Sequence, residues 1–272
     1  MSQRVSALGF NSNIPFMYCS ATFLTESKTS SEFPQYTPLA SLYNRSEVYS
    51  ARAIMKKEEV MADIGNFGIL PVVRTANSAD AVTIIDAVIA GGCRLIEVTM
   101  TIPGAVDVIR STVDAGRNVL VGAGTVSSAA EAKRCIAAGA RFIVSPWIER
   151  EVIRYCTAAG VLVIPGVLTP TEVRTAQKMG ADMVKIFPAS SMGGPPYIRA
   201  LRSVMPGVKF IPTGGVSVEN AADYIGAGAF AVGIGSDLVS INQVRTGDPS
   251  AISKISSLVS QVKDARAAAT ST

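Results

Sequence analysis

The sequence contains no histidine in its 272 residues. Histidine is the commonest zinc ligand and the usual general base near pH 7. Its absence therefore excludes histidine-based zinc sites and every Ser-His or Cys-His catalytic arrangement. Acid–base chemistry in this protein must use carboxylates, lysine, tyrosine, cysteine or backbone groups.

Cysteines and clustered positive charges are also scarce. The four cysteines are widely spaced and form no C-x-x-C pair, so neither a disulfide scaffold nor a redox motif is expected. The formal net charge is +4, without a long run of lysine and arginine, which argues against a nucleic-acid partner. Glycine, proline or charge interrupts every apolar stretch before the roughly 20 residues needed to cross a bilayer. We expect a soluble protein with no membrane partner.

Residues 1–53 differ from the rest of the chain. They are rich in serine and threonine, contain few basic residues and show neither helical nor strand periodicity. Such composition is typical of organelle transit peptides, although Glu26, Glu32 and Glu47 argue against one. We interpret the segment as a poorly structured N-terminal extension. It is either a transit peptide to the plastid (chloroplast) or another organelle, or an extension of a cytoplasmic enzyme.

Residues 54–272 repeat one pattern and are interpreted as one domain. A short apolar, β-branched run is followed by a turn, an amphipathic stretch and a glycine able to end a helix. The apolar runs are 68–74, 95–99, 119–125, 142–146, 161–167, 183–188, 209–215 and 230–236. Eight strands alternating with helices roughly every 20 to 26 residues favour a (β/α)8 TIM barrel of the α/β class over an open doubly wound sheet.

Helix ends follow from the same pattern. Ser78 is the expected N-cap of the first crossover helix, and further helices are expected at 56–64, closing the barrel bottom or packing beside the first strand, and at 252–267. The glycines expected to end helices are Gly92, Gly116, Gly139, Gly160, Gly180 and Gly228.

The unusual residues of the chain lie where the expected strands end. TIM barrels place their active sites at the carboxyl ends of the strands, so these residues should meet in one site. They are Arg74, Glu97, Thr99, Thr125, Pro146, Lys185, Phe187, Thr213, Gly214, Gly215, Gly235 and Ser236.

Lys185 and Glu97 are ionisable groups inside apolar runs. Burial disfavours the protonated form of an amine, and a neutral amine can attack a ketone to form a Schiff base. Glu97 lies on the second strand, opposite the sixth, so its carboxylate could face Lys185 across the barrel mouth and transfer protons. The alternative interpretation is a buried structural ion pair.

Glycines at the ends of the seventh and eighth strands indicate a phosphate site. The segments 212–215 (Pro-Thr-Gly-Gly) and 233–236 (Gly-Ile-Gly-Ser) stand where barrels commonly bind phosphate through backbone N–H groups at a following helix N-terminus. The similar segment 122–125 (Gly-Ala-Gly-Thr) follows the third strand, and we assign it to the carboxylate end of the substrate.

Six motifs in one order resemble a known family. They are Glu-Val-Thr at 97–99, Gly-Ala-Gly-Thr-Val at 122–126, Ser-Pro at 145–146, Pro-Gly at 165–166, Lys-Ile-Phe-Pro-Ala at 185–189 and Pro-Thr-Gly-Gly at 212–215. From about residue 54 to 267 the chain resembles the 2-keto-3-deoxy-6-phosphogluconate and 4-hydroxy-2-oxoglutarate aldolases, class I enzymes that include 2-keto-3-deoxy-6-phosphogalactonate aldolase.

The resemblance implies roles for the strand-end residues. Lys185 would form the Schiff base with the C2 ketone of a phosphorylated 2-keto-3-deoxy sugar acid, and Glu97 would move protons. The residues expected to contact substrate are Thr99, Thr125 and Thr213, with Pro146 and Phe187 as walls and Gly214, Gly215, Gly235 and Ser236 at the phosphate. A homotrimer without metal or other cofactor is also implied.

Two departures from the family pattern affect specificity. The Glu-Val-Thr motif continues Met100-Thr101 where much of the phosphogluconate branch has Leu-Arg, whose arginine meets the substrate carboxylate. Arg74 could supply that guanidinium instead. Segments 190–197 and 235–238 look more like the phosphogalactonate branch, so the residues leave open which C4 epimer of the substrate the protein prefers.

Two other functions stay open for the same residues. One is a phosphate-binding barrel isomerase, epimerase or synthase in which Lys185 acts only electrostatically, since a fold does not fix a function. The other is a non-catalytic sugar-phosphate binding protein, in which a buried lysine and glutamate would be a needless desolvation cost.

Overall fold

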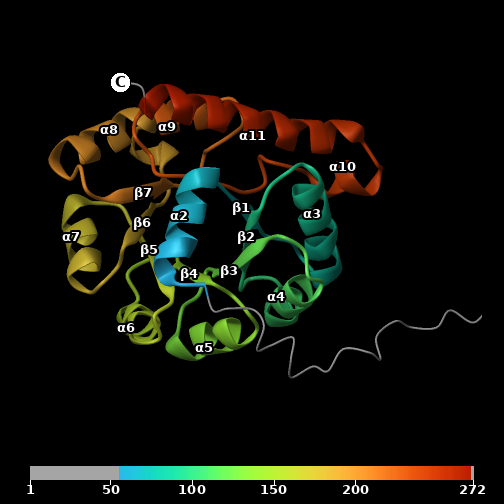
Figure 1. The fold of residues 1–272 in the computed structure, drawn as a ribbon, viewed down its shortest axis with the longest axis horizontal. Helices are drawn as coiled ribbons and strands as arrows, with labels where there is room; N and C mark the ends of the chain where they lie inside the picture. Colours follow the sequence, from blue (N-terminus) through green and yellow to red (C-terminus); the bar gives the residue numbers. More distant parts are fainter. Residues whose placement is uncertain (1–54, 271–272) are drawn as a thin grey trace, which may run out of the picture. The chain divides into compact units, whose positions relative to one another are not determined.

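The computed structural model describes residues 55–270, which contain eight parallel strands in a nearly closed barrel (Figure 1). The strands are β1 (Ile69–Val73), β2 (Leu95–Thr99), β3 (Leu120–Gly124), β4 (Phe142–Ser145), β5 (Leu162–Val167), β6 (Met183–Ile186), β7 (Lys209–Pro212) and β8 (Val232–Ile234). Sequence neighbours pair with one another, β1 also pairs with β8, and a single bridge between Thr213 and Gly233 joins β7 to β8. The predicted TIM barrel is confirmed.

Helices alternate with the strands around the barrel (Figure 1). They are α2 (Lys57–Phe67), α3 (Ser78–Ala90), α4 (Ala105–Asp114), α5 (Ala129–Ala137), α6 (Arg150–Ala158), α7 (Pro170–Lys178), the 3₁₀ turn η2 (Ser190–Met192), α8 (Pro195–Val204), α9 (Ala221–Gly226), α10 (Ile241–Arg245) and α11 (Pro249–Thr270). The helices expected at 56–64 and 252–267 are present and longer than expected. Among the described helices, none combines the length and apolarity that a membrane crossing requires.

Helix ends agree with the sequence, with one correction. The six glycines expected to end helices all have positive φ, a conformation that glycine adopts without steric cost. The N-cap of α3, however, is Asn77 and not Ser78, because the Asn77 side chain accepts a hydrogen bond from the Asp80 amide at 2.9 Å.

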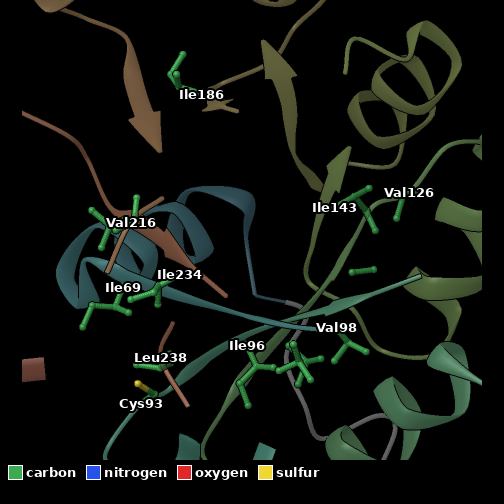
Figure 2. Close-up of a cluster of buried hydrophobic side chains, with 14 of the residues drawn as sticks. Ile69, Cys93, Ile96, Val98, Val126, Ile143, Ile186, Val216, Ile234 and Leu238 are labelled. Carbon is green, nitrogen blue, oxygen red and sulfur yellow. The ribbon is translucent and has the colours of Figure 1, made fainter. Parts of the chain in front are cut away.

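Strand residues alternate between two apolar layers. One side chain in two points outward into the layer between strands and helices, part of which is drawn in Figure 2, including Ile96, Val98 and Ile186. The inward residues form a second cluster, to which α2 contributes Val60 and Ile64. Helix α2 therefore closes the amino end of the barrel, the first of the two placements expected for it. The predicted extension, residues 1–53, and its boundary lie outside the described residues.

Candidate active site

The inward register of the strands continues to their carboxyl ends, where it carries polar residues. On β2 the side chains that face the barrel interior are those of Leu95 and then Glu97. On β6 they are those of Met183 and then Lys185. The ladder pairs Glu97 with Gly122 of β3 and Lys185 with Gly166 of β5. Because β2 and β6 lie opposite each other, the two charged side chains meet inside the barrel.

Lys185 and Glu97 form a buried ion pair at the centre of the barrel. The distance between Lys185 Nζ and Glu97 Oε1 is 3.5 Å, and the two residues are 8% and 1% exposed. The other carboxylate oxygen, Glu97 Oε2, is buried without a hydrogen-bond partner in the described part of the chain. An unsatisfied buried acceptor costs about 1–3 kcal/mol, which suits an atom that accepts a proton or hydrogen bond from a ligand.

Glycines on β3 make room for this pair. A Cβ on Gly124 would lie 1.9 Å from Glu97 Oε1, and a Cβ on Gly122 would lie 2.1 Å from the Phe142 ring. Both glycines are therefore required by packing inside the barrel, whereas the assignment of segment 122–125 to the substrate carboxylate stays a prediction. The following residue, Thr125, has a φ of 57°, an uncommon value for a β-branched residue.

A cavity of about 340 Å³ opens above Lys185. Ten of the predicted residues line it: Arg74, Thr125, Pro146, Lys185, Phe187, Thr213, Gly214, Gly215, Gly235 and Ser236. Glu97 lies below the cavity, in contact with Lys185. Thr99 does not reach the cavity; its hydroxyl donates to the Val73 carbonyl at 3.0 Å and lies 2.9 Å from the Thr101 hydroxyl.

Three further residues line the cavity and were missed by sequence reasoning: Val72, Val216 and Asp237. Val72 could have been found from the period-two alternation that places Arg74 inward. Asp237 lies in segment 235–238, whose likeness to the phosphogalactonate branch was a signal for it, but its position in the loop after β8 is not periodic.

One wall of the cavity is cationic and polar. Arg74 Nη2 donates a hydrogen bond to Thr125 Oγ1 at 3.3 Å, which directs the guanidinium over the end of β3. On another side, Lys185 Nζ lies 5.7 Å from the centre of the Phe187 ring, a distance at which a cation is attracted by the ring face. The exposed Phe187 ring thus borders the entrance to the buried amine.

The loops after β7 and β8 leave backbone donors available. Gly214 and Gly215 have φ values of 87° and 73°, which favour glycine, and a Cβ on Gly215 would lie 2.1 Å from Ser190 Oγ. Within residues 55–270, neither the Gly215 amide nor the Ser236 amide donates a hydrogen bond. Helices α9 and α10 begin several residues later, so the cavity is lined here by loop residues and not by a helix N-terminus.

The site therefore combines a buried amine, a carboxylate with an open acceptor and a cavity with cationic and amide donors. Between residues 55 and 270, no group of three potential metal-ligating side chains comes together. The arrangement can form an imine with a ketone and transfer protons beside it, while the donors hold an anionic substrate.

Known proteins are similar to this chain in sequence and fold. Residues 60–255 match the family described as KDPG and KHG aldolase. The chain is 36% identical over 194 residues to the 2-dehydro-3-deoxy-phosphogluconate aldolase of Treponema pallidum, covering 71% of this chain and 92% of that protein. It is 38% identical over 177 residues to the 2-dehydro-3-deoxy-6-phosphogalactonate aldolase of Escherichia coli, covering 64% and 86%.

A solved structure extends the similarity to three dimensions. KDPG aldolase from Legionella pneumophila, with pyruvate captured as a covalent carbinolamine intermediate, has a TM-score of 0.65 and 30% identity. The match covers 78% of this chain and 98% of that one.

Proposed function

Because the chain belongs to the KDPG and KHG aldolase family of class I aldolases, we propose that it cleaves 2-keto-3-deoxy-6-phosphogluconate (KDPG) to pyruvate and glyceraldehyde 3-phosphate. The observation that carries the proposal is the 3.5 Å approach of Lys185 Nζ to Glu97 Oε1 beneath the cavity. Cleavage of 4-hydroxy-2-oxoglutarate to pyruvate and glyoxylate by the same residues is part of the proposal.

Lys185 is the proposed nucleophile. Glu97 first takes a proton from the Lys185 ammonium of the ion pair, and the neutral amine attacks C2 of the substrate. A proton then moves from the nitrogen to the former ketone oxygen, which gives a carbinolamine while Glu97 keeps the proton it took. Glu97 then protonates that hydroxyl, water leaves and an iminium ion remains. The positive iminium nitrogen is the electron sink for the next step.

Glu97 is also the proposed base for carbon–carbon cleavage. It removes the proton of the C4 hydroxyl; the C4–O bond becomes a carbonyl while the C3–C4 electron pair moves into the iminium. Glyceraldehyde 3-phosphate leaves, the enamine is protonated at C3, and water releases pyruvate from Lys185. The unpartnered Glu97 Oε2 supports this role, since an acceptor is already in place beside the amine.

Arg74 is proposed to hold the substrate carboxylate. Its guanidinium lines the cavity beside Thr125, and a planar fork suits a carboxylate. Arg74→Ala is expected to raise the KM for KDPG at least about tenfold, the value of one lost charge-assisted hydrogen bond. Unchanged KM and kcat in the folded variant would remove Arg74 from the site.

The remaining lining residues are proposed to position the rest of the substrate. Thr125 and Thr213 contact the pyruvyl part, Pro146 and Phe187 form walls, and the phosphate binds at the loops after β7 and β8. The Gly215 and Ser236 amides support the last assignment because they have no acceptor within the described chain. Thr99 is left out, since its hydroxyl is engaged with the β1 backbone.

The alternative substrate is 2-keto-3-deoxy-6-phosphogalactonate, the C4 epimer. Segments 190–197 and 235–238 favour it. The identities of 36% to a phosphogluconate aldolase and 38% to a phosphogalactonate aldolase do not separate the two substrates. Comparing kcat/KM for the two epimers under the same conditions decides between them.

We further propose that the protein is a homotrimer, which light scattering tests. We also propose an organellar or cytoplasmic location, which fusion of residues 1–53 to a fluorescent protein tests.

The experiment that tests the mechanism is intact mass spectrometry after incubation with pyruvate and sodium borohydride. We expect a stable pyruvate adduct that maps to Lys185 and is absent in Lys185→Met. No adduct in the folded protein would contradict the Schiff-base mechanism and favour a non-covalent phosphate-binding barrel enzyme. A variant Lys185→Met that bound substrate while the parent showed no activity would favour a binding protein.

A further inference from the structure

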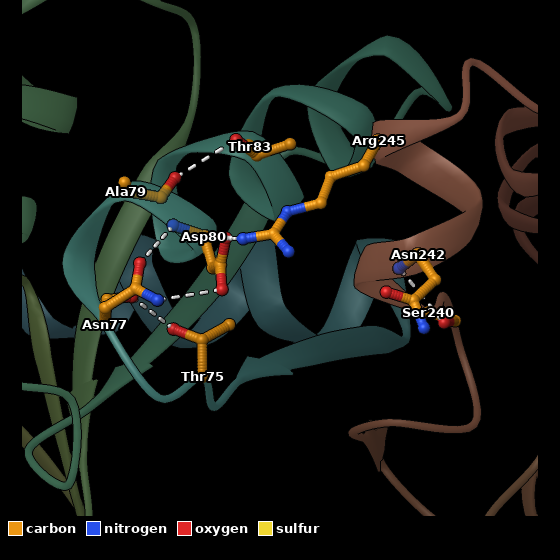
Figure 3. A network of polar contacts seen from close by, with 8 residues as sticks. All are labelled: Thr75, Asn77, Ala79, Asp80, Thr83, Ser240, Asn242 and Arg245. Carbon is orange, nitrogen blue, oxygen red and sulfur yellow. Dashed lines mark hydrogen bonds and ion pairs between the residues drawn. The ribbon is translucent and has the colours of Figure 1, made fainter.

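An ion pair ties the helix after β8 to the helix after β1. Arg245, in the last turn of α10, donates from Nη2 to Asp80 Oδ1 in the first turn of α3 (Figure 3). The two residues are 165 positions apart. The Asp80 side chain is 13% exposed and that of Arg245 is 56% exposed, so one partner is nearly buried and the other reaches in from the surface.

The Asp80 carboxylate is held in place independently of the arginine. Asn77 Nδ2 donates to Asp80 Oδ2 at 2.9 Å, and the Asp80 amide donates to Asn77 Oδ1 at 2.9 Å (Figure 3). The amino end of α3 also favours a negative charge in its first turn. Arg245 therefore meets a preoriented carboxylate, which lowers the side-chain entropy lost when the pair forms.

The Arg245 side of the pair belongs to an element that cannot be stable alone. Helix α10 has five residues, far fewer than an isolated helix needs in water. It follows directly on the loop 235–240, which contains the proposed phosphate ligands Gly235 and Ser236. That loop is further held by burial of Leu238 and by Lys254 Nζ, which donates to the Asp237 carbonyl at 2.7 Å.

Packing behind this loop is incomplete. A second cavity of about 390 Å³ lies between β1, α3 and the loop, and Asp80 is part of its lining. Arg74, Gly235 and Ser236 line this cavity as well as the one above Lys185. Since the loop borders this open space and not packed side chains on that side, its polar ties add to the burial of Leu238 in keeping its position.

We propose that Asp80 and Arg245 are positioning residues for the phosphate end of the substrate. By anchoring α10 on α3, the ion pair holds the loop 235–240 so that the Gly235 and Ser236 backbone faces the cavity above Lys185. This inference rests on the proposed phosphate site. The competing interpretation is a surface ion pair of little consequence, as many exposed pairs are.

The test separates phosphate recognition from chemistry at Lys185. Arg245→Ala removes an exposed side chain and should fold; we expect its KM for KDPG and its inhibition constant for inorganic phosphate to rise about two- to fivefold. Its kcat and its rate of pyruvate–borohydride adduct formation should stay unchanged, because pyruvate has no phosphate. Arg245→Lys should recover part of the affinity.

Two further variants complete the cycle. Asp80→Asn should raise the KM for KDPG as much as Arg245→Ala does. The KM of the double variant should not exceed that of the more impaired single variant, since both substitutions remove the same interaction. The matched control is Arg117→Ala, which breaks the ion pair with Asp86 on the same helix α3, away from the cavities, and should leave KM unchanged.

The outcomes distinguish this inference from the proposed function. Ser236→Asp should strongly weaken phosphate inhibition, because it places a negative charge at the proposed site. If Ser236→Asp has this effect while Arg245→Ala and Asp80→Asn have none, the positioning role is overturned and the phosphate site stands. If none of the three changes phosphate inhibition, both are overturned. If Arg245→Ala slows pyruvate–borohydride adduct formation as much as it weakens phosphate inhibition, the substitution damages the structure in general, which also overturns the positioning role.

Discussion

The two ends of the barrel interior differ sharply, although the same strands build both. At the amino end the inward residues are mostly apolar, including Leu95, Phe142 and Met183, and α2 covers them. At the carboxyl end, two positions further along, the inward residues include Glu97 and Lys185. Two strand residues span about 6–7 Å, so this short distance separates a stabilising core from a charged site.

The comparison teaches how a buried ion pair is tolerated in this fold. Removing two charges from water costs several kcal/mol, which their mutual attraction offsets only in part. The apolar amino end supplies favourable burial and keeps the strands in register, so the carboxyl end can hold groups that do not maximise stability. Substitutions at the two ends should therefore separate stability from activity.

The largest expected effect is at the carboxyl end, in Glu97→Gln. Replacing the carboxylate removes the proposed proton acceptor, so kcat should fall about 10²- to 10⁴-fold. Steady-state kinetics on KDPG and the exchange of pyruvate methyl protons for deuterium both measure it. If the folded Glu97→Gln variant exchanges pyruvate methyl protons for deuterium at the wild-type rate, another group moves the protons.

At the amino end, Phe142→Ala should affect stability and spare catalysis. Truncation of this fully buried ring leaves a cavity in the interior cluster and should lower the free energy of unfolding by about 3–5 kcal/mol. Urea unfolding measures the loss. The kcat of the protein that remains folded should change less than about threefold, and a fall comparable to that of Glu97→Gln would break the division between the two ends.

Two glycines on β3 provide a matched pair on one inward face. Gly124→Ala brings a methyl group against the Glu97 carboxylate, whereas Gly122→Ala brings it against the Phe142 ring. We expect Gly124→Ala to lower kcat about 10²-fold by displacing Glu97. Gly122→Ala should instead cost about 1–3 kcal/mol of stability through overpacking. Equal effects of the two variants on kcat would contradict the comparison.

The smallest effect concerns the outer layer between strands and helices, where three cysteines are buried. Burial raises the pKa of Cys93 and Cys156 to about 12 and, with the nearby Glu131, that of Cys135 to about 11. Because the folded state holds these thiols protonated, their contribution to stability is complete below pH 9.0, the ordinary thiol value, and is lost as the pH rises through the folded pKa.

This pH dependence can be measured one thiol at a time. One pH unit above 9.0, each thiol should have lowered the free energy of unfolding by about 1.4 kcal/mol. Urea unfolding between pH 8 and 10 should show a shallower decline for Cys156→Ala than for the parent protein. If the free energy of unfolding declines with pH equally in the two proteins, the Cys156 thiol does not titrate on unfolding. In both proteins kcat should not follow the pH dependence of this free energy.

Much of the fold and site could be predicted from the sequence because the signals are local. Short apolar, β-branched runs and helix-ending glycines located the strands and helices, and the rule that barrel sites lie at strand ends selected Lys185, Glu97 and Thr213. Strand ends were placed one to three residues too far in several cases, since loop residues such as Pro146 and Phe187 continue the apolar pattern without joining the ladder.

Other features depended on tertiary structure because they join residues distant in sequence. The sequence alone determined that β2 and β6 each carry one inward charge; barrel closure decided that these charges lie 3.5 Å apart. Closure also decided that Gly122 and Gly124 make room for neighbouring side chains, that Thr99 binds backbone, and that Arg245 reaches Asp80. Local periodicity determines which face a side chain occupies, whereas its neighbours follow from how the volumes of eight strands fit around one axis.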